Sequence, residues 1–318
     1  MAPEQPIRIG IAGLGRRGAH WLERLSLRED FRVTAAFDEP QRTLFAERFG
    51  CRRHSSWETF LEDPSFDLVL IATEAERHPE LVSQALTAQK HVFVEPPLAL
   101  TTRAAQALIA SADMAGRFLG TVESRRGDGD FRTAQAALRE GRLGTLVAAR
   151  LIRWGPALLT TDDMASSSFR TLWEFGLPLI DQTLAFFEAA PQRVSAQWTG
   201  AEAADGFLAT LEFSDGRRAT IDCDFRCLAP LQTGWTLIGS AGTWKSGRVY
   251  ASSPDGEVFD VPAEVLPTDS DHWCSLLKER LGDRTRALES AHQAVRVVET
   301  IELLIRSGLS GQPAALPR

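Results

Sequence analysis

The sequence predicts an α/β fold in two domains, an N-terminal domain over residues 1–122 and a C-terminal α+β domain over residues 123–318. Three observations lead to this prediction. The chain of 318 residues is longer than a typical single domain. Up to residue 122, short apolar runs alternate with helical patterns. Beyond it, several strand-like segments follow one another, separated by turn signals such as Ser214-Asp215-Gly216.

The composition is that of an ordinary globular protein, with 44% hydrophobic and 24% charged residues, which excludes a disordered or collagen-like chain. The net charge is −7 and no run of Lys and Arg is present, so we expect no nucleic-acid partner. No apolar stretch approaches the ~18 residues of a membrane span, and no export signal is visible. We therefore expect a cytoplasmic protein without membrane contact. The four Cys lack metal-ligand spacing, so we expect no metal site.

The first domain reads as five strands that alternate with five helices. The expected strands span residues 7–12, 31–37, 66–72, 91–95 and 118–122, and the helices 19–27, 44–49, 57–61, 79–88 and 102–115. The strands are almost continuously apolar, which is typical of a parallel sheet covered by helices on both faces. Such sheets bind ligands beyond the carboxyl ends of their strands.

A glycine turn joins the first strand to the first helix, with the sequence Gly-Leu-Gly-Arg-Arg-Gly. Gly13 permits a tight turn, Gly15 allows a pyrophosphate to approach the backbone, and Gly18 lets helix and strand pack closely. The pyrophosphate would bind the free N–H groups at the helix start. Arg16 and Arg17 lie where the helix dipole disfavours cations, a conflict that a bound diphosphate would relieve. Both could instead be solvated surface residues.

An acid follows the second strand at the spacing of a dinucleotide site. Asp38 lies 20 residues beyond Gly18, where a carboxylate accepts hydrogen bonds from the adenosine ribose. It would repel a 2′-phosphate, so NAD is favoured over NADP, although Arg42 offsets part of that repulsion. A helix cap is the alternative role of Asp38. Further candidates for cofactor contact follow other strands, namely Thr73, His78, Glu95 and Pro96.

The second domain combines helices with a largely antiparallel sheet. We expect helices at 131–140, 174–190, 272–281 and 287–307, and strands at 146–154, 193–198, 207–213, 217–225, 234–240 and 243–249. Segments 207–213 and 217–225 are expected to form a hairpin. A sheet with one open face often buries that face in an oligomer. We therefore expect a homodimer or homotetramer that assembles through this sheet.

In order and spacing these motifs resemble the Gfo/Idh/MocA oxidoreductases over nearly the whole chain. The resemblance rests on the glycine turn, Asp38, the segments 73–78, 89–97 and 172–181, and the Arg125-Arg126 pair before the helix at 131. It implies an N-terminal Rossmann domain that binds NAD(P), a second domain that binds substrate, and sugar- or polyol-like substrates.

The chain departs from the family pattern at the residues that normally transfer a proton. Pro96 stands at the family's lysine in Glu-Lys-Pro, and Pro178 at its histidine. Proline carries no ionisable group, and a positioned acid or base typically contributes ~10²–10⁴-fold to the rate. The replacement candidates are Glu174 and Asp181. Gly176 and Pro178 place the helix start near residue 177, with Glu174 in the preceding loop. The two acids could instead be a helix-entry acid and a salt-bridged one.

By resemblance, one group of side chains would face the substrate. The group consists of Arg153, Trp154, Arg170, Trp173 and Arg226. Arginines would suit an acidic sugar or another carboxylated ligand. Core packing of the tryptophans and surface ion pairs of the arginines are the alternatives.

Three functions remain open from the sequence. The first is an NAD(P)-dependent oxidoreductase with an atypical catalytic set. The second is a cofactor-binding sensor or structural protein with little turnover. The third is an NAD-assisted lyase or glycosidase. Pro96 and Pro178 weigh against the first and third.

Overall fold

The computed structural model describes residues 5–38, 40–156, 169, 172–200, 205–283 and 286–316. The chain forms two compact units. Unit 1 comprises Met1–Val122 and Leu276–Val298, and unit 2 comprises Glu123–Ser275 and Glu299–Arg318. The first change of unit coincides with the boundary expected from the sequence, whereas residues 276–298 join unit 1. The division into a cofactor-binding domain over residues 1–122 and a substrate and oligomerisation domain over residues 123–318 stays a prediction.

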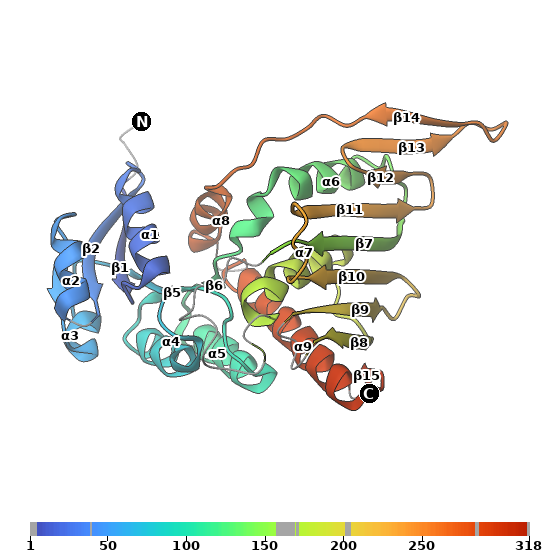
Figure 1. The fold of residues 1–318 in the computed structure, drawn as a ribbon. Coiled ribbons are helices and arrows are strands. Elements are labelled where there is room, and N and C mark those ends of the chain that lie inside the picture. The colour runs from blue at the N-terminus through green and yellow to red at the C-terminus, as the bar shows by residue number, and fades with distance from the viewer. Residues whose placement is uncertain are drawn as a thin grey trace. The chain divides into compact units, whose positions relative to one another are not determined.

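Unit 1 is built on a parallel sheet whose described strands lie in the order β3-β2-β1-β4-β5-β6 (Figure 1). The order reverses between β1 and β4, which is where such sheets bind ligands. The strands are β1 (Ile7–Ala12), β2 (Phe31–Phe37), β3 (Arg52–His54), β4 (Leu68–Ile71), β5 (His91–Val94) and β6 (Leu119–Thr121). The helices are α1 (Arg16–Ser26), α2 (Pro40–Glu47), α3 (Trp57–Leu61), α4 (His78–Thr87) and α5 (Thr102–Ala115). The predicted fold class is confirmed here, and the sequence missed only the short β3 among these strands.

Helices on both faces of this sheet explain why its central strand β4 is apolar throughout. All four residues of β4 are buried. The rings of Phe60 and Phe66 pack 4.7 Å apart under the sheet, and Ala291 and Ala294 of the last helix join the same core. Burial of this kind is the main stabilising contribution to the unit.

Unit 2 contains a sheet whose described strands lie in the order β14-β13-β12-β11-β7-β10-β9-β8-β15. Only the β7–β10 pair is parallel among the described pairs, so the predicted antiparallel character is confirmed. The strands are β7 (Leu146–Trp154), β8 (Arg193–Thr199), β9 (Gly206–Glu212), β10 (Arg218–Asp224), β11 (Gln232–Gly239), β12 (Thr243–Lys245), β13 (Arg248–Ser252), β14 (Val258–Pro262) and β15 (Ala314–Ala315). The helices are α6 (Gly129–Arg139), α7 (Leu177–Phe187), α8 (His272–Leu281) and α9 (Glu289–Ser310), of which the last two span the change of unit.

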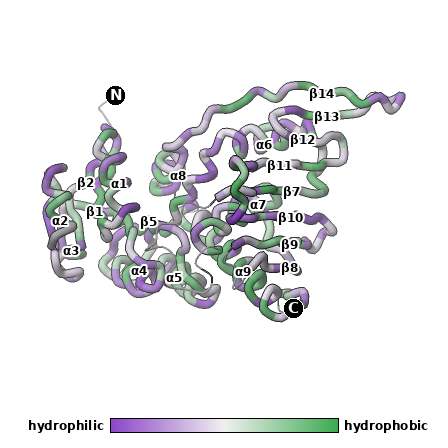
Figure 2. The backbone as a smooth tube through the Cα atoms, viewed as in Figure 1, coloured by the Kyte–Doolittle hydropathy of each residue, from purple (hydrophilic) through white to green (hydrophobic). Residues whose placement is uncertain are grey.

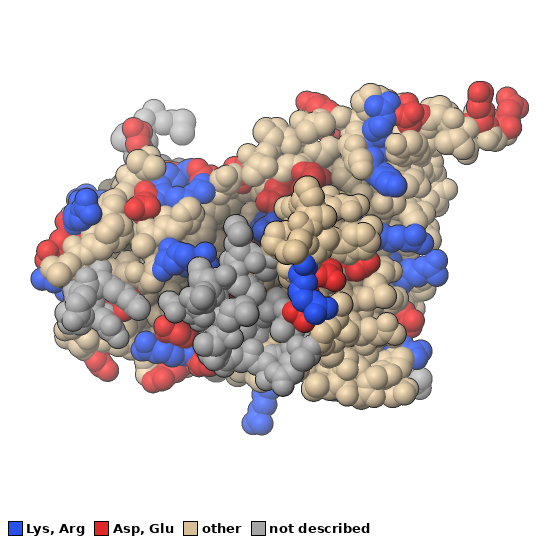
Figure 3. All heavy atoms as spheres, in the orientation of Figure 1, with Lys and Arg blue, Asp and Glu red and all other residues tan. Residues whose placement is uncertain are grey.

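One face of this sheet is covered by helices and the other is open. On the covered face, Phe186 of α7 packs between Phe131 of α6 and Trp235 of β11, with ring centroids 4.8 and 5.0 Å apart. In β7, which is partly in the hydrophobic colour in Figure 2, Leu146, Ala148, Ala149 and Leu151 are buried. On the open face Leu208 is 43% exposed. Acidic and basic side chains are interspersed on the surface shown in Figure 3.

The prediction of a single strand at residues 243–249 is wrong, because this segment forms a hairpin of two strands. Ser246 and Gly247 both have positive φ, 50° and 77°, and they connect Lys245 of β12 to its partner Arg248 of β13. A two-residue loop of this kind needs two residues with φ > 0, which Gly supplies readily. The sequence analysis also missed β14.

Candidate cofactor and substrate sites

The glycine turn of unit 1 leaves no room for side chains at two of its three glycines. Gly13 has a φ of +88°, and a Cβ there would lie 2.7 Å from the backbone of Ala72. A Cβ on Gly18 would lie 1.7 Å from the carbonyl oxygen of Gly13. The first glycine therefore makes the turn, and the last lets α1 pack against it, as the sequence predicts.

The middle glycine faces open space instead. Gly15 precedes α1, makes no side-chain capping bond, and has no neighbour within 4 Å of where a Cβ would stand. The N–H groups at a helix start have no partner within the helix and attract anions. A diphosphate can therefore approach the backbone of this turn and bind its N–H groups.

Asp38 lies beside this turn, at the end of β2. Its Oδ2 accepts a hydrogen bond from the backbone N–H of Leu14 over 2.5 Å. That bond fixes the carboxylate at the carboxyl edge of the sheet, where the ribose of a dinucleotide would meet it. Arg42 belongs to α2, but its side chain lies outside the described part of the structure.

Glu95, at the end of β5, binds two side chains of α1. Arg17 Nη1 lies 3.2 Å from Glu95 Oε2, and Trp21 Nε1 donates to Oε1. Glu95 is only 8% exposed, so this carboxylate neutralises Arg17 in a largely dry environment. The charge conflict at the start of α1 is thus relieved at Arg17 by the protein itself. Arg16, its neighbour, is exposed.

His78 connects two of the loops that follow the strands. Its Nδ1 lies 2.8 Å from the Pro97 carbonyl oxygen and its Nε2 lies 3.1 Å from that of Thr73. Burial lowers the pKa of His78 although both carbonyls would raise it, which favours the neutral ring. A neutral imidazole donates only one hydrogen bond, so His78, which is 1% exposed, donates to one of these two carbonyl oxygens. In the loop after β5, the Pro96-Pro97 peptide bond is cis.

Thr73 supplies a polar atom that no other described residue binds. Its Oγ1 is buried and makes no hydrogen bond within the described residues. Because buried hydroxyl groups normally have a partner, this atom is available to a ligand at the carboxyl edge of the sheet. Together with Gly15 and Asp38, it fits the dinucleotide that the sequence predicts.

In unit 2, Asp181 is engaged by Arg126. Its two carboxylate oxygens accept hydrogen bonds from Arg126 Nε and Nη2, at 2.8 and 2.7 Å. Burial would lower the pKa of Arg126, but the charge of Asp181 outweighs it and raises that pKa, so the guanidinium stays charged. The next residue, Gln182, donates to the Arg125 carbonyl oxygen over 2.6 Å. The start of α7 therefore clamps the 3₁₀ turn Ser124–Gly127.

Glu174 lies in a π-helical turn, Leu172–Gly176, that runs directly into α7. The helix α7 begins at Leu177 with Pro178 in its first turn, as the sequence predicts. The prediction that Glu174 lies in a loop is therefore wrong, because one π-helical turn precedes α7 and contains this residue. Trp173 belongs to the same turn and is half-buried.

Arg153 and Trp154, adjacent at the end of β7, point to opposite faces of the sheet, as strand geometry requires. Trp154 Nε1 donates to Asp222 over 3.1 Å on the open face. Arg153 shares the covered face with Leu151, which is 1% exposed. The two side chains therefore cannot line one side of a single site.

The other residues of unit 2 that were predicted to face the substrate are Arg226 and Arg170. Arg226 is exposed and pairs with Asp205 over 3.3 Å, which matches the surface-ion-pair alternative. Arg170 lies outside the described residues. Nor do the described residues include a group of three or more His, Cys, Asp or Glu arranged for a metal ion.

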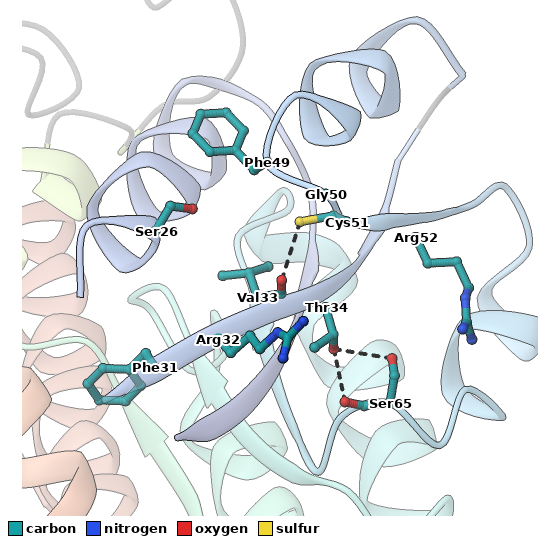
Figure 4. Close-up of a pocket in the computed structure, with 10 residues that line it drawn as sticks. All are labelled: Ser26, Phe31, Arg32, Val33, Thr34, Phe49, Gly50, Cys51, Arg52 and Ser65. Atoms are coloured by element: carbon teal, nitrogen blue, oxygen red, sulfur yellow. Dashed lines mark hydrogen bonds between the residues drawn. The ribbon is translucent and has the colours of Figure 1, made fainter. Parts of the chain in front are cut away.

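A cavity in unit 1 lies away from the glycine turn (Figure 4). Its volume is about 560 Å³, and it is lined by the first residues of β2, including Arg32 and Thr34, and by Cys51. Burial raises the pKa of Cys51 to about 11, so the thiol stays protonated. Because this cavity lies at the amino end of β2, the opposite end from Asp38, it is not where the cofactor would bind.

Comparison with known families agrees with this geometry. The family model described as "Oxidoreductase family, NAD-binding Rossmann fold" matches residues 7–122, and the GFO/IDH/MocA C-terminal domain matches residues 131–245. The Escherichia coli protein named oxidoreductase YdgJ is 32% identical over 278 residues, which cover 77% of this chain and 80% of the relative. The chain belongs to the Gfo/Idh/MocA oxidoreductase family.

Two further similarities extend over almost the entire chain. A myo-inositol 2-dehydrogenase from Thermotoga maritima is 26% identical over 318 residues, covering 98% of this chain and 90% of the relative. The crystal structure of GenD2, from gentamicin A biosynthesis and in complex with NAD, has a TM-score of 0.81 at 23% identity, covering 99% and 97% of the two chains. Both units therefore have the fold of Gfo/Idh/MocA proteins, and unit 1 is an NAD-binding Rossmann domain.

The two prolines that depart from the Gfo/Idh/MocA pattern lie where the sequence predicts, one after a strand and one at a helix start. Pro96 follows Glu95 at the end of β5, and Pro178 occupies the first turn of α7. Sequence analysis missed the partners of the acids it singled out, Trp21 for Glu95 and Arg126 for Asp181. Trp21 shows only the helical spacing of a core residue, whereas Arg126 belongs to the family's Arg-Arg motif and could have been found there.

No helix of the described residues is long and apolar enough to cross a bilayer.

Proposed function

We propose that this protein is an NAD-dependent oxidoreductase that acts on a CH–OH group of a sugar- or polyol-like substrate. The glycine turn carries the proposal, because Gly15 opens toward solvent beside an uncapped helix start. The similarity to a relative named myo-inositol 2-dehydrogenase supports a polyol. NAD is favoured over NADP because the carboxylate of Asp38, held by Leu14, would repel a 2′-phosphate.

NAD, when bound, supplies the hydride acceptor. The chain must then supply the proton acceptor, and the two positions normally used hold Pro96 and Pro178. Both oxygens of Asp181 already accept hydrogen bonds from the buried Arg126. Of the acids singled out from the sequence, Glu174, on the turn before α7, is the proposed proton acceptor. Asp181 would act as a positioning residue that fixes Arg126 and the turn beside it.

Turnover on a panel of inositols, aldoses and sugar acids, followed by NADH absorbance, tests this proposal. The expected result is NAD⁺-dependent turnover that falls ~10²–10⁴-fold in Glu174→Gln. The pH profile of kcat separates a proton-transfer role from a structural one. In Glu174→Gln, a proton-transfer role predicts that kcat no longer depends on the titration of one acidic group, while KM for NAD⁺ is unchanged. An unchanged rate in Glu174→Gln would remove that residue from the mechanism.

A second candidate is a cofactor-binding sensor or structural protein with little turnover. The two prolines favour it, because neither can move a proton. Saturable NADH binding without turnover on any member of the panel is the result that this candidate predicts.

Self-association through the sheet of unit 2 stays a prediction. The exposure of Leu208 on the open face is consistent with a covered surface there. Light scattering of the eluting protein would give a dimer or tetramer mass, and a monomer mass would contradict the prediction.

A further inference from the structure

Arg153, at the end of β7, is a cation for which the described part of the chain provides no carboxylate partner. Its Nη1 is buried and makes no hydrogen bond within the described residues. The strands on either side bring Cys223 and Thr233 level with it. Neither is an anion, because burial raises the pKa of Cys223 and keeps its thiol protonated.

The charged groups near Arg153 add to its positive charge. Burial lowers the pKa of Arg153, and the nearby Arg125 lowers it further. Two acids of unit 2 are engaged by Arg125 and Arg126. Asp181 binds Arg126, and Asp128 lies 3.6 Å from Arg125. An uncompensated cation in such surroundings has a free-energy cost that an anionic ligand would remove.

Aromatic rings form one side of this environment. The guanidinium carbon of Arg153 lies 5.7 Å from the ring centroid of Phe225. The ring of Phe175 packs against Phe225 with centroids 5.5 Å apart. Phe175 belongs to the π-helical turn that also carries Glu174, the proposed proton acceptor. Arg153 therefore adjoins the part of unit 2 in which the proposed chemistry would occur.

Arg153 differs from Arg193 and Arg226 of unit 2, which each have a carboxylate partner. Arg226 pairs with Asp205, and the exposed Arg193 lies 4.0 Å from Glu212. A guanidinium recognises a carboxylate through charge-assisted hydrogen bonds, and one uncompensated cation matches one negative charge.

We propose that the substrate is an acidic sugar or polyol whose carboxylate binds Arg153. This inference rests on the proposed function, since it specifies the substrate of the same site. It excludes simple neutral inositols and aldoses as the preferred ligands.

Calorimetric titration of the full chain, with and without NADH, tests this proposal. The probes are matched pairs of an acid and its neutral counterpart, namely D-glucuronate with D-glucose, D-galacturonate with D-galactose, and D-gluconate with D-glucitol. For at least one pair, we expect the acid to bind roughly tenfold to hundredfold more tightly. In Arg153→Met the two members should bind equally, and in Arg153→Lys the preference should be intermediate. Arg193→Gln, a matched control on an exposed arginine, should keep the full preference.

Equal binding of acid and neutral sugar in every pair would overturn the proposal, as would a preference that survives in Arg153→Met. Arg153→Met should melt no lower than the wild type, because it removes an uncompensated charge. If that variant does not fold, an unchanged preference in Arg153→Lys decides against the proposal. A separate titration with NADH keeps the two proposals apart: an acid preference that depends on Arg153, without NADH binding, would contradict the proposed function and leave this carboxylate site standing.

Discussion

The glycine turn of unit 1 and the Arg153 region of unit 2 differ in how their charges are balanced. Around the turn, Asp38 binds the Leu14 N–H, and Glu95 binds Arg17 and Trp21. At Arg153, a buried guanidinium nitrogen has no partner within the described residues. The first region presents backbone N–H groups in a preformed cradle, whereas the second presents an uncompensated charge.

This difference corresponds to two kinds of recognition, that of the cofactor, which a family shares, and that of the substrate, which differs between its members. A dinucleotide is recognised largely by backbone geometry, which a few glycines specify over a short stretch of sequence. A substrate is recognised by side chains that different strands and turns bring together. We therefore expect changes in unit 1 to affect any reaction of this protein, and changes in unit 2 to alter which molecule it accepts.

The largest effect on cofactor binding is expected from Gly18→Ala. Its Cβ would meet the Gly13 carbonyl oxygen at 1.7 Å, so α1 must move and the cradle must open. We expect NADH binding to be lost and the free energy of unfolding to fall by about 1–3 kcal/mol. Gly15→Ala is the matched control for the fold, because its Cβ meets nothing within 4 Å.

Gly15→Ala should change the free energy of unfolding by less than about 0.5 kcal/mol while weakening NADH binding. Urea unfolding and NADH fluorescence titration measure the two effects separately. If Gly15→Ala bound NADH as tightly as the wild type, the diphosphate would not lie against this turn.

Asp181→Asn tests the ion pair that holds the start of α7. Removing the negative charge leaves the buried Arg126 charged, and we expect a loss of about 3–5 kcal/mol in the free energy of unfolding. Asp128→Asn, on the exposed Arg125 pair, should cost less than about 1 kcal/mol. Urea unfolding of both variants makes the comparison, and equal losses would show that the Asp181 pair has no special weight.

The double substitution Pro96→Lys with Pro178→His restores the groups that the family resemblance implies. If the cradle is intact and only proton transfer is impaired, turnover with NAD⁺ should rise by about 10²-fold. Steady-state kinetics on the polyol panel measure the change. An unaltered rate, with NADH binding retained, would place the limitation elsewhere.

Asp38→Asn should have the smallest effect of the four. The variant can still accept from Leu14, but it no longer repels a 2′-phosphate. We expect roughly tenfold weaker NAD binding and a reduced preference over NADP, since the change removes hydrogen bonds to a charged group. Asp30→Asn, at the other end of β2, is the control and should leave both affinities unchanged. A full preference for NAD in Asp38→Asn would assign the selection to another residue.

Sequence reasoning succeeded where structure is determined locally. The roles of Gly13 and Gly18 follow from strand, turn and helix within a dozen residues, and both agree with the structure. It failed where partners are distant. Arg126 lies 55 residues before Asp181, and nothing local to Asp181 indicates that bond. The opposite orientation of Arg153 and Trp154 could have been predicted from the two-residue period of a strand.

Calorimetric titration of the wild-type protein with NADH, repeated with NADPH, decides whether unit 1 holds a dinucleotide site. We expect saturable binding of one NADH per chain and weaker binding of NADPH. Absence of binding by either nucleotide would contradict the claim that the open space at Gly15 and the carboxylate of Asp38 form a dinucleotide site.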